Sequence, residues 1–390
     1  MRDVIVSGIG MTNFGKFLSR GLKSLSEEAV AAALKDAGVT TDQVEQVIFG
    51  NAAAGVITGQ EMIRSQSALR NTGLDGTPMF NIENACASSS SGFHLGWLMI
   101  ASGQAECVIV VGCEKLTHEN KEISFGAFAG AVDVEEPLPK GFKEGSGSLF
   151  MDIYALKARK WLEDNGGDKE DFARVVVKSR QAGSLNPIAQ FRNKTTTEEV
   201  LQSRVISDPL TLFMCSSIGD GAAAIVLTSE TLANKLATPN IRVRASAVVS
   251  AKTCGDRELV AVTAANKAYE MAGLGPKDLD VVELHDATAP AELFHYENLG
   301  LCMPGDAVAL IRSGETAVGG RIPVNPSGGL MSRGHPIGAT GAGQIIELVQ
   351  HLRGTAGARQ TEGAKVALAE NNGGQLAGDS AIAVVTILSV

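Results

Sequence analysis

The segment DQVEQVIFGNA (residues 42–52) decides the fold, because it has a counterpart, KDLDVVELHDA (residues 277–287), in the second half of the chain. Matching positions lie 235 residues apart without a gap, as for Val47 with Val282 and Asn51 with Asp286. Each copy follows an Ala-Gly pair typical of a helix end, and its apolar residues then predict a short buried strand. The pattern favours two similar α/β halves; a chance likeness of two helix–strand units is the alternative.

A second pair of similar segments supports the repeat. The strand-like segment AECVIVVGCE (residues 105–114) matches AKVALAENNG (residues 364–373), and each follows a long helical stretch. We therefore expect two sheets covered by helices and packed face to face. Sites in such sheets form outside the carboxyl ends of the strands, so polar residues at those ends are candidates for function.

Residues 117–204 have no counterpart in the second half and predict an inserted loop domain. This stretch contains a polar, Gly-rich part (residues 140–148) with Lys143, and an amphipathic helix is predicted from Tyr154 to Asn165. The predicted organisation is a first half at 1–116 and 205–235, the insertion at 117–204, and a second half at 236–390.

Composition excludes several classes of partner. The chain has 34 basic and 43 acidic residues and a formal net charge of −9, without a Lys/Arg block, which argues against nucleic acid or an anionic membrane as partner. The sequence has neither an apolar N-terminal stretch nor a run long enough to span a membrane. Its six scattered cysteines form no C-x-x-C pair and suit reduced thiols. We expect a cytoplasmic protein.

Cys86 is the first candidate catalytic residue. It lies in NACASSSSG (residues 84–92), directly before an apolar helical stretch. A cysteine at the first turn of a buried helix lies at the positive end of the helix dipole, which favours the thiolate. The small residues after it would leave backbone N–H groups free to bind an oxyanion. The alternative is a buried structural cysteine, which is common for this residue type.

His335 is the second candidate. It stands in SRGHPIGATG (residues 332–341), soon after NPSGG (residues 325–329). A histidine between glycine and proline has a fixed backbone and little side-chain cover, so it could take a proton from a thiol or donate to an oxyanion. The alternative is a loop histidine that caps a carbonyl. The glycines match neither G-x-G-x-x-G nor a Walker motif, so a phosphate loop is not predicted.

Two further polar segments follow predicted strands. His285 lies in ELHDAT (residues 283–288), and Glu370 begins ENNGG (residues 370–374). Both segments would open onto one cavity if the repeat is real, with free backbone N–H groups near Glu370. An ordinary turn is the alternative for the second segment. A metal site is not expected, because no further ligands are spaced for one.

In this order, the four segments resemble the thiolase family over essentially the whole chain. ACASS near residue 86, NPSGG and GHPIGATG are specific in combination. The His-Asp motif at 285 resembles the sterol-carrier-protein-type and archaeal branch. The resemblance implies two pseudo-repeated βαβαβαββ domains in a five-layered αβαβα arrangement with an inserted loop domain. It also implies an acyl-CoA C-acyltransferase that cleaves or forms a 3-oxoacyl-CoA by Claisen chemistry.

The resemblance assigns a role to each candidate residue. Cys86 would be the acyl-accepting nucleophile and His335 the residue that activates it. His285, with His335, would hold one oxyanion, and the backbone N–H of Cys86, with that of Asn372 or Gly373, would form the second oxyanion hole. Ser250 would contact the pantetheine arm of coenzyme A. Coenzyme A is implied as a substrate, with no permanently bound cofactor and no metal.

The sequence departs from the family pattern at the second cysteine. Thiolases carry it in a C-x-G-G-G segment, where the alignment of glycines places Glu370 to within one residue, or directly after His-Asp, where this chain has Ala287. Our hypothesis is that Glu370 transfers the proton, provided that burial raises its pKa. The absent thiol and the Ala287-Thr288 pair resemble thiolases that cleave benzoylsuccinyl-CoA, which suggests an aromatic or branched substrate.

Two other functions remain open at this point. One is a condensing or aldolase enzyme on the same fold, and the other is a non-catalytic acyl-CoA-binding subunit. The resemblance further implies a homodimer or tetramer and a possible small zinc-ribbon/OB-fold partner subunit. Nucleic acid and membranes are not expected as partners.

Overall fold

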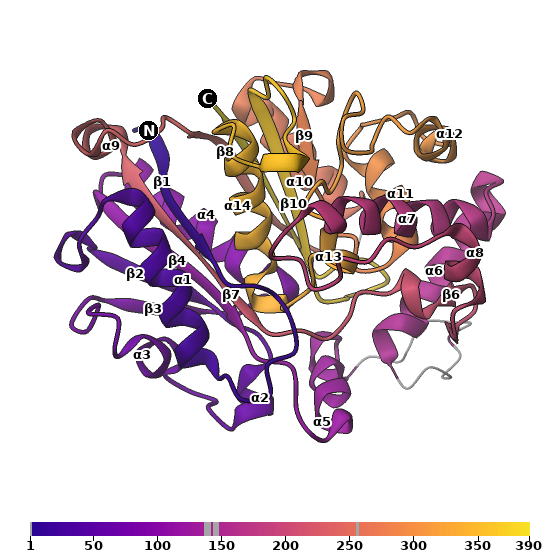
Figure 1. Cartoon of the computed structure of the whole chain (residues 1–390), viewed down its shortest axis with the longest axis horizontal. Helices are drawn as coiled ribbons and strands as arrows, with labels where there is room; N and C mark the ends of the chain where they lie inside the picture. Colours follow the sequence, from indigo (N-terminus) through magenta and orange to yellow (C-terminus); the bar gives the residue numbers. More distant parts are fainter. Residues whose placement is uncertain (1, 136–141, 143–147, 255–256) are drawn as a thin grey trace.

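One large sheet organises the molecule (Figure 1). The computed structural model describes residues 2–135, 142, 148–254 and 257–390, so most of the Gly-rich part at 140–148, including Lys143, lies outside the described residues. The nine strands of this sheet hydrogen-bond in the order β3-β2-β4-β7-β1-β8-β11-β10-β9. They are β1 (Val4–Met11), β2 (Gln46–Gly50), β3 (Met79–Ile82), β4 (Cys107–Glu114), β7 (Gly221–Ser229), β8 (Arg242–Ser250), β9 (Val281–Glu283), β10 (Val366–Gly373) and β11 (Ile382–Ser389).

The two halves of the sheet repeat each other. In the first half β2 runs parallel to β4, and β7 and then β1 follow antiparallel. In the second half β9 runs parallel to β10, and β11 and then β8 follow antiparallel. A parallel bridge between Val282 and Val324 occupies the place beside β9 that β3 occupies beside β2. The halves join where Ile5 of β1 pairs with Arg242 of β8.

Helices form three layers around the half-sheets. The central helices α4 (Ser88–Ala101) and α14 (Thr340–Leu352) share one buried apolar cluster with β1, β4, β7 and β10. The outer helices α1 (Leu22–Ala37) and α3 (Arg64–Leu69) cover the first half, and α10 (Val260–Ala272) and α11 (Ala289–Asn298) cover the second. The five-layered αβαβα fold with its internal repeat is therefore confirmed.

The central layer packs closely because small residues face the sheet. A Cβ atom at Gly96 of α4 would lie 3.1 Å from a methyl carbon of Val110. One at Gly112 of β4 would lie 2.6 Å from the carbonyl oxygen of Gly338, which belongs to the loop after His335. These contacts bring the loop of the second half directly against the first half.

Helices α6 (Leu149–Asn165) and α7 (Lys169–Leu185) of the inserted segment lie against the second half (Figure 1), whereas its helix α5 (Lys121–Gly126) contacts α2 (Ala54–Thr58) of the first half. Both α6 and α7 contact α11, and the predicted helix from Tyr154 to Asn165 forms the greater part of α6. The predicted domain boundaries remain predictions. The remaining elements are α8 (Thr197–Gln202), β5 (Val205–Ser207), β6 (Leu210–Thr211), α9 (Glu230–Leu236), α12 (Ala307–Ser313) and α13 (Gly329–Ser332).

Within the described ranges, no helix combines the length and the apolar character that crossing a bilayer requires. The six cysteines are all free thiols.

Candidate active site

Cys86 lies in a tight 3₁₀ turn, Ala85–Ala87, immediately before α4. Ala85 adopts a left-handed conformation with φ 48°, and its N–H donates to the carboxylate of Glu83 at 2.6 Å. Ser88 closes the turn, because its hydroxyl donates to the carbonyl of Ala85 at 2.7 Å and accepts the N–H of Asn84 at 3.0 Å. Cys86 as a whole residue is partly exposed, whereas its thiol is buried from water.

His335 presents a bare ring nitrogen to the centre. Its Nδ1 lies 2.8 Å from the hydroxyl of Thr340, which itself donates to the carbonyl of Pro336 at 3.1 Å. The hydroxyl therefore accepts from Nδ1–H, and Nε2 is left as an acceptor. Burial, reinforced by the neighbouring charge of Arg333, lowers the pKa of His335 to about 3. The neutral ring can act as a base.

His285 presents the opposite group. The side-chain amide of Asn371 donates to its Nδ1 at 2.9 Å, and the hydroxyl of Ser90 orients that amide by donating to its oxygen at 2.8 Å. The proton of neutral His285 is therefore on Nε2. Burial lowers the pKa of His285 well below its usual value, and the nearby His335 and His295 lower it further. His285 is a hydrogen-bond donor at neutral pH.

The structure brings these three side chains together from both halves. The sulfur of Cys86 and one ring nitrogen each of His285 and His335 all lie within 4.8 Å of one another. The two rings are nearly perpendicular, with centroids 5.2 Å apart. A thiol and two imidazoles at this spacing could also hold a zinc ion. The absence of a resident metal stays a prediction.

The ionisation of Cys86 differs from the expectation of a resting thiolate. Burial, with a smaller contribution from the carboxylate of Glu114, raises the pKa of Cys86 to about 12. The loss of water around the sulfur outweighs the stabilisation from backbone N–H at the start of α4. The thiol is therefore protonated at neutral pH, and its proton must leave during the attack.

The end of β10 lies against the turn of Cys86. A Cβ atom at Gly373 would be 2.2 Å from the carbonyl oxygen of Asn84 and 3.0 Å from the backbone nitrogen of Ala87. Only glycine allows this approach. The backbone of Gly373 thus lies where the second oxyanion hole is predicted, whereas the side chain of Asn372 turns away to His295, with 3.1 Å between Nδ2 and Nε2.

Glu370 and Asn371 point to opposite faces of β10. Leu368, on the face of Glu370, packs in the apolar cluster with the outer helices α10 and α11. Ala369, on the face of Asn371, packs in the cluster with the central helices α4 and α14. Asn371 thus reaches the ring of His285 from the central side. The carboxylate of Glu370 accepts the backbone N–H of His285 at 2.9 Å and leaves Oε1 without a partner.

The hypothesis that Glu370 transfers a proton required that burial raise its pKa, and the structure has this effect. Burial raises the pKa of Glu370 to about 8, and the charge of Asp379 adds to this rise. Glu370 is therefore mostly protonated at neutral pH and could give up a proton. It lies outside the compact group of Cys86, His285 and His335.

Glu114 is a site residue that the sequence did not single out. It ends β4, and its buried carboxylate accepts the N–H of Ala52 and that of Gly338, each at 3.0 Å. It therefore ties the loop after His335 to the first half. Burial raises the pKa of Glu114 to about 7. The sequence offered one sign of this role: Glu114 is a charged residue at the end of a predicted buried strand of the repeat. Asn371 lay within the ENNGG segment that the sequence pointed to, whereas His295 carried no comparable signal.

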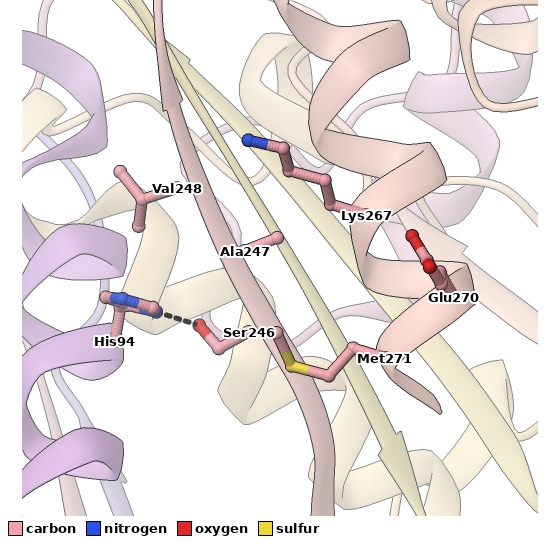
Figure 2. A pocket seen from close by; sticks show the side chains of 7 residues that line it. All are labelled: His94, Ser246, Ala247, Val248, Lys267, Glu270 and Met271. Carbon is pink, nitrogen blue, oxygen red and sulfur yellow. Dashed lines mark hydrogen bonds between the residues drawn. The ribbon is translucent and has the colours of Figure 1, made fainter. Parts of the chain in front are cut away.

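Ser250 lies at the end of β8 and lines a cavity of about 310 Å³ together with Lys252 and Arg257. A second cavity, of about 480 Å³, lies between α4, β8 and α10 (Figure 2). There the ring of His94 faces Ser246, with 3.1 Å between Nδ1 and Oγ. None of the three central side chains lines either cavity.

Comparison with known sequences decides the family. The domain family described as "Thiolase, N-terminal domain" matches residues 4–231, and the one described as "Thiolase C-terminal domain-like" matches residues 245–388. The chain belongs to the thiolase family. It is 37% identical over 387 residues to an acetyl-CoA acetyltransferase of Methanothermobacter thermautotrophicus, covering 96% of this chain and 97% of that one. It is 35% identical over 384 residues to the benzoylsuccinyl-CoA thiolase subunit BbsB of Thauera aromatica, covering 96% and 95%.

Human sterol carrier protein 2 is 34% identical over 388 residues, which cover 96% of this thiolase-family chain and 70% of the human protein. Among solved structures, the Ltp2-ChsH2(DUF35) aldolase matches with a TM-score of 0.80 and 26% identity over 98% of this chain and 97% of that chain. Human mitochondrial 3-ketoacyl-CoA thiolase matches with a TM-score of 0.72 and 21% identity over 100% and 98%, a likeness of fold. The predicted fold, family and acyl-CoA C-acyltransferase class are confirmed, and the non-thiolase alternatives are not favoured.

Proposed function

We propose that this thiolase-family enzyme cleaves or forms a 3-oxoacyl-CoA through an acyl group carried on Cys86. The observation that carries the proposal is the triangle of Cys86, His285 and His335, whose reactive atoms lie within 4.8 Å. A bare nitrogen and an N–H donor beside one thiol suit a base and an oxyanion donor.

In the degradative direction, the proton of the Cys86 thiol passes to Nε2 of His335 as the sulfur attacks the 3-keto carbon. The backbone N–H groups of Cys86 and of Asn372 or Gly373 hold the resulting oxyanion. The close packing of Gly373 on the Cys86 turn supports Gly373 for this role. Preorganised donors of this kind are usually the largest single contribution to the rate.

Collapse of the adduct breaks the C2–C3 bond and expels an acyl-CoA enolate. The Nε2–H group of His285 and the protonated His335 face the enolate oxygen. The enolate carbon takes a proton from Glu370 or from a water molecule, and the raised pKa of Glu370, about 8, supports the carboxyl as the donor. The thiol of free CoA then removes the acyl group from Cys86. Its proton restores Glu370, and His335 returns the first proton to Cys86.

Coenzyme A is the proposed second substrate, and no permanently bound cofactor is required. Ser250 is proposed to contact its pantetheine arm. Lys252 and Arg257 line the same cavity of about 310 Å³, and their charges suit the phosphates of coenzyme A.

The substrate side chain and the assembly are also proposals. An aromatic or branched acyl group such as benzoylsuccinyl-CoA is supported by the match to the Thauera aromatica subunit, whose name states that substrate. A homodimer or tetramer is proposed from the family resemblance alone. A small zinc-ribbon/OB-fold partner is supported by the match to the Ltp2-ChsH2(DUF35) aldolase, whose name includes a DUF35 component. A cytoplasmic location remains a prediction.

Mass spectrometry of the acylated enzyme tests the proposal. Brief incubation with acetoacetyl-CoA and with benzoylsuccinyl-CoA, without free CoA, should add one acyl mass to the peptide that contains Cys86. The Cys86→Ala variant should show no such mass and no thiolysis, whereas Cys254→Ala, at an exposed thiol, should behave as wild type. An acyl group on any other residue, or turnover by Cys86→Ala, would overturn the proposal.

A further inference from the structure

A second group of polar side chains lies on the outer face of β10, beneath the inserted segment. We call Tyr154, Lys157, His295, Glu370 and Asn372 the outer cluster. Glu370 and Asn372 share one face of β10, opposite to Asn371. Tyr154 and Lys157 stand one turn apart on the same side of α6, which packs against α11, the helix of His295.

Short distances connect the cluster. Nε2 of His295 lies 3.1 Å from Nδ2 of Asn372, and its Nδ1 lies 3.8 Å from Oε2 of Glu370. Nζ of Lys157 donates to the side-chain oxygen of Gln375 at 2.9 Å. The charge of Lys157, after burial, lowers the pKa of His295, so the ammonium lies close enough to act on that ring.

The cluster adjoins the Cys86 centre. Asn372 directly precedes Gly373, whose backbone lies against the Cys86 turn. Burial raises the pKa of the Tyr154 phenol, and negative charge at Cys86 and Glu370 raises it further, so the phenol lies within electrostatic reach of both groups. An acyl group on Cys86 would therefore lie next to the outer cluster.

Two atoms of the cluster lack a hydrogen-bond partner. They are Oε1 of Glu370 and Oδ1 of Asn372, both in buried side chains. Both atoms are oxygens: Oδ1 of Asn372 can only accept a hydrogen bond, whereas the protonated carboxyl of Glu370 can donate one. The space therefore suits a polar group better than an alkyl chain.

The charge of the space is positive at neutral pH. Among the described residues, no carboxylate lies within ion-pair distance of Lys157, and its hydrogen-bond partner is the neutral amide of Gln375. Burial lowers the pKa of Lys157 below its usual value, and the charge of Asp379, whose oxygens accept the N–H groups of Val260 and Ser380, opposes this fall. Glu370, with a pKa of about 8, is mostly neutral. Lys157 therefore gives the space an unbalanced positive charge.

We propose that the outer cluster binds a free carboxylate on the acyl group, so that the preferred substrates are 3-oxoacyl-CoA thioesters with a second acid function. Lys157 is the specificity residue, and the carboxyl of Glu370 completes the polar lining. This inference rests on the proposed function. An acyl chain that ends in a methyl group would leave Lys157 unpaired and the polar atoms unsatisfied, which disfavours its binding.

A matched pair of substrates tests the inference. 3-Oxoadipyl-CoA and 3-oxohexanoyl-CoA have chains of equal length that end in a carboxylate and a methyl group. We expect kcat/KM for thiolysis to favour the carboxylate by at least about tenfold, which corresponds to about 1.4 kcal/mol. Lys157→Met should abolish the preference by raising KM for 3-oxoadipyl-CoA, and Lys157→Arg should keep part of it. Lys160→Met, which removes an exposed lysine of the same helix paired with Asp164, should leave the preference intact.

Other results of these assays would overturn either the inference about Lys157 or the proposed function. A wild-type enzyme that prefers the methyl-ended chain overturns the inference, and so does a Lys157→Met variant that loses both activities equally. A raised KM for CoA in that variant would assign Lys157 to the phosphates of coenzyme A instead, again against the inference. Thermal unfolding of each variant verifies its folding, while the wild-type preference decides the question independently. If wild type cleaves neither substrate and Cys86 carries no acyl group, the proposed function itself fails.

Discussion

At the scale of single residues, the site contains two histidines of the same chemical type in complementary states. The hydroxyl of Thr340 fixes the proton of His335 on Nδ1, whereas the amide of Asn371 fixes that of His285 on Nε2. The surrounding hydrogen bonds, and not the histidines themselves, thus divide the work between a base and a donor. The protonated Cys86 thiol between them requires the base.

The different protonation states of His335 and His285 predict that substituting each one reduces a different set of activities. Exchange of an acyl group between acyl-CoA and labelled CoA needs the base but forms no enolate. His335→Asn should therefore lose both exchange and cleavage of 3-oxoacyl-CoA. His285→Asn should lose about 10²–10³ in the rate of cleavage, as for one oxyanion donor, and keep most of the exchange. Parallel assays of isotope exchange and thiolysis measure both, and an equal loss of the two activities in His285→Asn would contradict the assignment.

The state of Cys86 predicts how its alkylation depends on pH. Only the thiolate reacts with iodoacetamide, and the pKa of Cys86 is raised to about 12. The thiolate fraction should then grow about tenfold for each pH unit between 7 and 9, and the alkylation rate with it. Peptide mass spectrometry follows Cys86 and, as an accessible reference, the exposed Cys254. A rate at Cys86 that stays flat from pH 6 to 9 would indicate a resting thiolate–imidazolium pair and refute this prediction.

At the scale of elements, the site depends on how closely the end of β10 approaches the turn before α4. Successive side chains of β10 point to opposite faces, so Asn371 hydrogen-bonds to His285 on one face while Glu370 and Asn372 belong to the outer cluster on the other. Gly373 ends the strand where a side chain would collide with Asn84. One short segment thus supplies a positioning amide, a candidate acid and a candidate oxyanion donor.

Gly373→Ala tests the importance of this contact. The added methyl group would lie 2.2 Å from the carbonyl oxygen of Asn84, so the strand end and the Cys86 turn must separate. We expect kcat to fall by at least about tenfold, since displacements of this size are costly in catalysis. Gly21→Ala, where no atom lies within 4 Å of the added carbon, is the control and should retain normal kcat. Steady-state kinetics and thermal unfolding compare the two, and an unchanged kcat in Gly373→Ala would exclude this contact as essential.

At the scale of the whole molecule, the internal repeat predicted two similar α/β halves, and the resemblance of the four polar segments to the thiolase family implied the five layers and the meeting of Cys86, His285 and His335. The ionisation of Cys86 could not be predicted, because helix-end stabilisation and burial act in opposite directions and only packing decides between them. The faces of Glu370 and Asn371 required the strand register. Lys157 and His295 could not be anticipated, because they come from the insertion and from α11, whose contacts have no sequence pattern.

The assembly of one thiol and two imidazoles from both halves predicts inhibition by zinc. Zinc prefers sulfur and nitrogen ligands, and the three atoms need to close only slightly from within 4.8 Å. Low micromolar Zn²⁺ should inhibit thiolysis, EDTA should restore it, and Mg²⁺ should have no effect because it prefers oxygen ligands. Calorimetry should find one zinc site that Cys86→Ala removes and Cys254→Ala keeps. Zinc binding that survives in Cys86→Ala would place the metal elsewhere.

The carboxylate of Glu114 holds the loop after His335, and β10 enters the sheet among the last segments of the chain. During synthesis on the ribosome, the nucleophile therefore emerges long before its base, its oxyanion donor and the strand that shapes its turn. Until the second half is folded against it, the first half lacks the base and the strand that acylation of Cys86 requires in the proposed mechanism, so a nascent first half should not capture acyl groups from thioesters. Reactivity begins only when the two halves have docked, which makes completion of the fold the step that switches the enzyme on.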